Sequence, residues 1–176
     1  PGLLWARHRA LVYQGKGAEA AKLVEGLPPR QRAYYLAGQF REDGDFAGAL
    51  RVLEEGYADA PPDGPDRLRL RRGELSVALE SGDGARIEKV SAELAGSGDP
   101  AIRGEGIYAR ALGHLPAGRG DAARAGAWEF LAKTDKDYSP LRFERLAMRF
   151  LAGELKAADL EAEAKEVSRF HANDLY

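Results

Sequence analysis

The chain of 176 residues has the length of one domain, and its charge is nearly balanced, with 26 Lys and Arg against 28 Asp and Glu. Its 31 Ala and 22 Leu far outnumber 3 Ile, 6 Val and a single Thr, which favours helices and excludes an all-β protein. The absence of Cys excludes disulfides and thiol nucleophiles but leaves the compartment open, and the net charge of −2 provides no global field for nucleic acid or an anionic membrane.

The beginning of the chain carries no targeting signal. The first apolar residues are followed at once by Arg7, His8 and Arg9, which is not the order of a signal peptide. No apolar run approaches the ~18–20 residues that a membrane-spanning helix needs. Because the chain has no initiator Met and stops at Tyr176, we expect it to be a fragment of a longer protein.

Amphipathic segments follow one another along the whole chain and predict ten helices. Their predicted ranges are 2–13, 18–26, 29–42, 46–59, 65–80, 84–95, 99–113, 120–133, 139–151 and 155–171. A glycine-bearing turn lies between the two helices of each predicted pair. These turns begin at Gly15, Gly44, Gly82, Gly118 and Gly153, with a mean spacing of 34.5 residues.

Proline sets a second period of similar length. Pro29, Pro65, Pro100 and Pro140 each open a predicted helix, where the fixed φ and the missing N–H of proline suit the first turn. Asp99 and Ser139, directly before two of these prolines, are predicted N-caps. Two periods of nearly equal length predict a repeated helix–turn–helix unit.

The apolar residues within these units follow helical spacing. In the second unit they are Ala33, Leu36, Ala37 and Phe40 before the turn, then Gly44-Asp45-Phe46, then Ala49, Leu53, Gly56 and Pro61. The fifth unit repeats the first part of this pattern with Phe143, Leu146, Ala147 and Phe150, and the first unit repeats the later part with Ala20, Val24 and Leu27.

This pattern resembles the tetratricopeptide repeat (TPR) family closely in the second unit and in part elsewhere. The departures are Arg7-His8 in the first unit, Glu74 in the third, the longer turn Leu115-Pro116-Ala117 in the fourth and one missing residue before Gly153 in the fifth. The resemblance implies an all-α, right-handed superhelical solenoid of about five antiparallel helix pairs with a concave groove. It implies a single domain over 1–176, with repeats at roughly 1–28, 29–62, 65–97, 99–136 and 139–176.

Motifs for catalysis or metal binding are missing from the sequence. His8, His114 and His171 would lie in different repeats, too far apart to share a metal ion. No H-E-x-x-H, G-x-S-x-G or P-loop occurs. We therefore expect no enzyme activity, no metal and no cofactor.

Three short matches have structural explanations. Gly15-x-Gly17-x-x-Ala20 fits a dinucleotide fingerprint but follows a predicted helix where that fingerprint needs a strand. Arg119-Gly120-Asp121 spells an adhesion tripeptide but coincides with the fourth turn, where we expect Asp121 to cap the next helix. Asp135-Lys136-Asp137 lacks the glycine and the distal glutamate of a calcium loop.

The first helix of each pair would present aromatic and basic side chains to the groove. Such side chains are typical of binding hot spots, and they would suit an acidic or aromatic peptide. The predicted groove residues are Trp5, Arg9, Tyr13, Tyr34, Arg41, Arg69, Arg72 and Tyr108. The alternative is that several of them pack between repeats or are simply solvated, since of the adjacent Tyr34 and Tyr35 only one can face the groove.

Two partner classes are disfavoured. Members of the family that clamp the C-terminal carboxylate of chaperones use Lys and Asn, where this chain has Trp5, Arg9 and Tyr35 and retains only Arg69 as a basic clamp residue. The basic run at 67–72 is divided between helix faces and flanked by acidic residues, which argues against nucleic acid.

The sequence therefore predicts a non-catalytic scaffold that binds a peptide or another protein in its concave groove. Two alternatives stay open. The chain could be an architectural module that self-associates through the ends of the stack, or a substrate-positioning arm of a larger bacterial enzyme.

Overall fold

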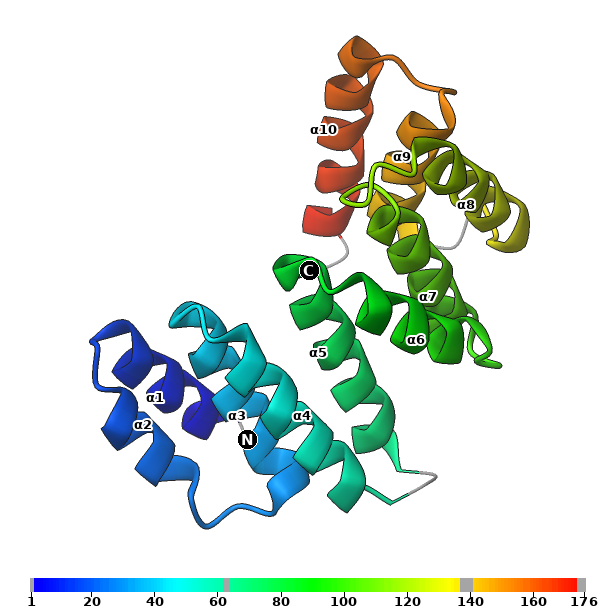
Figure 1. Ribbon diagram of the computed structural model, residues 1–176. Coiled ribbons are helices and arrows are strands. Elements are labelled where there is room, and N and C mark those ends of the chain that lie inside the picture. Colours follow the sequence, from blue (N-terminus) through cyan, green and yellow to red (C-terminus); the bar gives the residue numbers. More distant parts are fainter. Residues whose placement is uncertain (1, 62–63, 137–140, 174–176) are drawn as a thin grey trace. The chain divides into compact units, whose positions relative to one another are not determined.

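The computed structural model of the protein describes residues 2–61, 64–136 and 141–173, and over these ranges it contains helices and turns but no strand (Figure 1). The ten predicted helices are confirmed. They are α1 Gly2–Tyr13, α2 Gly17–Val24, α3 Pro29–Glu42, α4 Phe46–Asp59, α5 Pro65–Ser81, α6 Gly84–Ala95, α7 Pro100–Gly113, α8 Gly120–Lys133, α9 Arg142–Ala152 and α10 Ala157–Asn173. Most helices begin and end within two residues of the predicted positions. The exception is the start of α9, which was predicted at residue 139, outside the described residues.

The glycine turns are confirmed by their backbone conformation. All the described residues with positive φ are the first glycines of the five predicted turns, with φ between 69° and 88°. Residues with a Cβ are strained in this left-handed region, whereas glycine adopts it freely. The spacing of these glycines therefore determines where each helix pair turns back.

Helix starts follow the predicted proline pattern where the structure describes them. Pro29, Pro65 and Pro100 are each the first residue of a helix, and the Asp99 carboxylate accepts hydrogen bonds from the backbone N–H groups of residues 101 and 102, at 2.8 and 3.2 Å. The predicted Ser139 cap and Pro140 lie outside the described residues. The predicted cap at Asp121 is wrong: α8 begins at Gly120, as predicted, with Arg119 at the N-cap position, so the Asp121 carboxylate lies inside the first turn, near the positive end of the helix dipole.

The chain divides into two compact units, Pro1–Asp83 with α1 to α5 and Gly84–Tyr176 with α6 to α10. The boundary falls between the two helices of the predicted third repeat. Each unit is described by itself.

In the first unit every helix packs against the next one along the chain, and α3 also contacts both α1 and α5. The interface of α3 and α4 combines large apolar side chains with a close contact between two small residues. A Cβ on Gly56 would lie 2.7 Å from the Cβ of Ala33, so this glycine lets the two helices approach. Ala37, Leu53 and Leu70 are buried in the same core.

The second unit follows the same sequential packing, with an additional contact between α7 and α9. Phe130 is fully buried at its centre, together with Ile107 and Met148. The predicted apolar stripe of α9 is only partly buried, because Phe143 and Phe150 remain 42% and 43% exposed. The buried residues of α9 are Leu146, which belongs to the predicted stripe, and Met148 and Ala152, which lie about half a turn away from the two phenylalanines.

Candidate functional site

Two adjoining hollows lie between α1, α3 and α5, the first helices of the first three predicted pairs. One is a cavity of about 200 Å³ whose lining includes four predicted groove residues, Trp5, Arg9, Tyr34 and Arg41. The other has a volume of about 360 Å³ and is lined by Arg9, Gly38, Arg41, Glu42 and Glu80. We call these two hollows together the groove. A larger cavity of about 540 Å³ lies between α2, α3 and α4, but its lining includes none of the predicted groove residues.

A stripe of three predicted residues on α1 starts at the groove: Trp5 and Arg9 line it, whereas Tyr13 lines neither hollow. Trp5, Arg9 and Tyr13 are four residues apart and therefore lie on one side of the helix. The Cζ atom of Arg9 is 5.1 Å from the ring centre of Trp5 and 4.8 Å from that of Tyr13, so the guanidinium contacts both rings. Trp5 and Tyr13 are 53% and 65% exposed, which leaves both rings accessible to a ligand.

The charges of the groove are balanced by two ion pairs. Arg9 of α1 lies 3.7 Å from the Glu42 carboxylate of α3, and Arg41 of α3 pairs with Glu80 of α5 through two hydrogen bonds, one of them 3.0 Å long. Each guanidinium therefore already has a carboxylate of its own chain beside it. An acidic ligand would have to compete with Glu42 and Glu80, so the charge balance argues against selection of acidic peptides.

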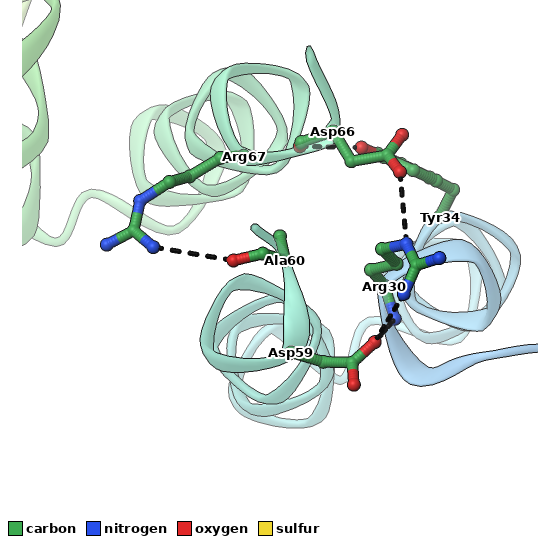
Figure 2. Close-up of polar contacts among 6 residues, drawn as sticks. All are labelled: Arg30, Tyr34, Asp59, Ala60, Asp66 and Arg67. Carbon is green, nitrogen blue, oxygen red and sulfur yellow. Dashed lines mark hydrogen bonds and ion pairs between the residues drawn. The ribbon is translucent and has the colours of Figure 1, made fainter. Parts of the chain in front are cut away.

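Tyr34 mainly joins α3 to the start of α5 (Figure 2). Its hydroxyl donates a hydrogen bond of 2.9 Å to the backbone carbonyl of Asp66, and the Arg69 guanidinium lies 4.2 Å from its ring centre. Burial, and then the negative charge of Asp66, raise the pKa of Tyr34 to about 12. Beside it, Arg30 bridges the carboxylates of Asp59 and Asp66, at 3.3 and 3.4 Å, so the hydroxyl of Tyr34 belongs to a contact between helices (Figure 2).

The remaining predicted residues lie elsewhere. Arg69 and Arg72 are exposed on α5 and do not line either hollow. Tyr108 is in the second unit, where its ring packs edge-on against Phe130 with 6.3 Å between ring centres. Burial and the charge of Glu144 raise the pKa of Tyr108, which fits the alternative interpretation that this tyrosine packs within the helical stack.

Two residues of the cavity wall that were not predicted for the groove carry buried polar atoms without a hydrogen-bond partner. His8 is 2% exposed, its ring packs edge-on against Tyr35 at 5.3 Å, and its Nε2 atom is buried without a hydrogen-bond partner. The Oε1 atom of Gln39, in the same wall, is also buried without a partner. In the sequence, the signal that set His8 apart from other residues of the first helix was its departure from the repeat pattern.

The stability of the first unit should depend on pH through His8. Burial, and then the positive charge of Arg9, lower the pKa of His8 below its ordinary value of 6.5. The unfolded chain therefore takes up this proton at a higher pH than the folded chain. The stabilisation is complete above pH 6.5 and decreases as the pH falls from 6.5 through the lower pKa of the folded state.

Urea denaturation at about pH 7.5 and about pH 5.5 measures this effect. We expect a lower midpoint at the lower pH, and a smaller difference in His8→Phe, which keeps a ring against Tyr35 but cannot take up a proton. Glu129 does not interfere, because hydrogen bonds from Lys133 and Arg110 lower its pKa below 4.5. Equal pH dependence in the two proteins would contradict the assignment to His8.

Within the described ranges, no three His, Asp or Glu side chains come together in a way that could hold a metal ion. Over the same part of the chain, no helix combines the length and the apolar character needed to cross a bilayer. Comparison with known proteins finds no significant match of the chain to a protein-family model, a curated protein or a solved structure.

Proposed function

We propose that the chain is a TPR-like helical-repeat scaffold that binds a peptide segment of a partner protein in the groove between α1, α3 and α5. The observation that carries this proposal is the convergence of Trp5, Arg9, Tyr34 and Arg41, from two helices, on one cavity. Tryptophan, tyrosine and arginine are the residue types most enriched among those that contribute large binding energies at protein interfaces.

The chemistry of the groove supports binding without catalysis. Among its described lining residues there is no serine, threonine or cysteine that could act as a nucleophile. The carboxylates of Glu42 and Glu80 are each occupied by an arginine, and they are 47% and 42% exposed. Such solvated, paired carboxylates lack the burial that separates the acid and base roles of catalytic pairs.

Peptide selection provides the test, because the two tryptophans of the chain are a matched pair. Trp5 is 53% exposed in the groove and Trp128 is 49% exposed on α8 in the other unit. Peptides are first selected from a displayed random library on the immobilised chain, and their affinities are then measured by fluorescence anisotropy. We expect Trp5→Ala to weaken the selected peptides by about 30-fold, the effect of losing roughly 2 kcal/mol at a hot spot, and Trp128→Ala to leave them unchanged.

Two results would overturn the proposal. One is a set of selected peptides whose affinity is equally insensitive to both tryptophan substitutions. The other is a chain that enriches no peptide and forms a stable oligomer in light scattering, which would favour self-assembly through the ends of the stack.

A further inference from the structure

Gly38 differs from the other glycines inside the described helices. Eight described glycines lie beyond the first residue of a helix, and for seven of them an added Cβ would come within 3.2 Å of another atom. Those seven are Gly48, Gly56, Gly73, Gly104, Gly106, Gly113 and Gly126. At Gly38 a Cβ would meet nothing within 4 Å. Packing therefore accounts for the seven glycines but not for Gly38.

The position of Gly38 indicates another reason for a glycine. It lies in the middle of α3, where glycine is the least favourable residue apart from proline, and it lines both hollows of the groove. A glycine without a packing role allows a close approach to the helix backbone from outside. The open space above Gly38 is therefore a place where a ligand can lie against α3.

The groups around Gly38 determine which ligand fits. Arg9 and Arg41 carry more N–H donors, and Glu42 and Glu80 more acceptor lone pairs, than their two ion pairs use, and all four side chains are between 37% and 47% exposed. An extended peptide main chain presents carbonyl acceptors and N–H donors along its length, which matches this balanced set and requires no particular charge. A helical segment would not use these groups in this way, because its main-chain N–H and C=O groups bond to one another.

We propose that the groove binds its partner segment in an extended conformation, with the main chain crossing α3 at Gly38 and one side chain entering the adjoining cavity. This inference rests on the proposed peptide-binding function. Successive side chains of an extended segment point to opposite sides, so a residue at the crossing can direct its side chain into the cavity of about 200 Å³ beside Trp5 and Tyr34. The groove would then select its partner segment by the extended conformation of the segment's backbone and by one anchoring side chain.

Two substitutions test this arrangement, because they separate stability from binding. Gly38→Ala and Gly38→Leu introduce better helix formers at a position where a Cβ meets nothing within 4 Å, and should raise the thermal midpoint of the protein. The same substitutions fill the path of the main chain, so we expect peptides selected on the original chain to bind about tenfold more weakly to Gly38→Ala and about 100-fold more weakly to Gly38→Leu. Gly84→Ala, at an open glycine in the other unit, is the control and should leave binding unchanged.

A second measurement uses the peptides themselves. Selected peptides are resynthesised with an N-methyl group at one backbone nitrogen at a time, which removes a main-chain donor and keeps every side chain. We expect methylation at the residues that cross Gly38 to weaken binding at least tenfold. The inference is overturned if peptides that depend on Trp5 tolerate both Gly38→Leu and methylation at every position. In that case the proposed peptide-binding function still stands. That function itself is overturned if the affinities of the selected peptides do not depend on Trp5.

Discussion

Replacing Phe130 with alanine is expected to lower the free energy of unfolding by about 3–5 kcal/mol. Phe130 is the largest side chain that is fully buried in the described chain, and it lies in the core of the second unit with Ile107 and Met148. Its removal takes away the packing of a whole ring and leaves a cavity that the surrounding helices can close only in part. Urea denaturation followed by circular dichroism measures the loss.

Phe150→Ala is the matched control for this prediction. Phe150 is 43% exposed, so truncation of its ring leaves no enclosed cavity, and we expect a loss of less than about 1 kcal/mol. Similar losses for Phe130→Ala and Phe150→Ala would show that the core of the second unit is not organised around Phe130.

Replacing Gly106 with alanine is expected to destabilise the second unit by about 1–3 kcal/mol, although alanine is the better helix former. A Cβ at this position would lie 2.4 Å from the backbone nitrogen of Ala95 and 2.7 Å from the backbone oxygen of Ser91. Both atoms belong to the main chain of α6, which cannot rotate away as a side chain can. The new methyl group must therefore push α6 and α7 apart.

Gly84→Ala provides the comparison for Gly106→Ala within the same unit. Gly84 is the first residue of α6, and a Cβ there would meet nothing within 4 Å, so we expect no loss of stability. The urea midpoint should fall for Gly106→Ala and stay level or rise for Gly84→Ala. A level or raised midpoint for Gly106→Ala would contradict the close approach of α6 and α7.

The sequence by itself determined the helices and the turns between them. The positive φ at Gly15 and Gly44, the helix start at Pro100 and the cap at Asp99 depend on conformational limits of single residues and on hydrogen bonds to neighbours two or three positions away. Because these causes are local, their positions could be predicted from residue types and spacing. The start of α8 at Gly120 was predicted, but the role of Asp121 was not: a carboxylate is favourable both at the cap and in the first turn, and this one lies in the first turn.

The candidate site was predicted in part. Trp5, Arg9 and Arg41 meet at the groove as the repeat pattern indicated, because helical spacing determines which side of each helix they occupy. The ion partners of the two arginines come from neighbouring helices, and the role of Tyr34 depends on the start of α5. No spacing within one helix contains that information.

Only the tertiary structure decided what each buried or small residue does. Phe143 and Phe150 follow the same spacing as buried residues of other helices, yet they stay 42% and 43% exposed, whereas Leu146 of the same stripe is buried together with Met148. Gly38 and Gly106 are both glycines inside helices and look equivalent in the sequence. The main chain of α6 lies against Gly106, and open space lies above Gly38. The roles of these two glycines are opposite because they depend on neighbours that are distant in the chain or absent.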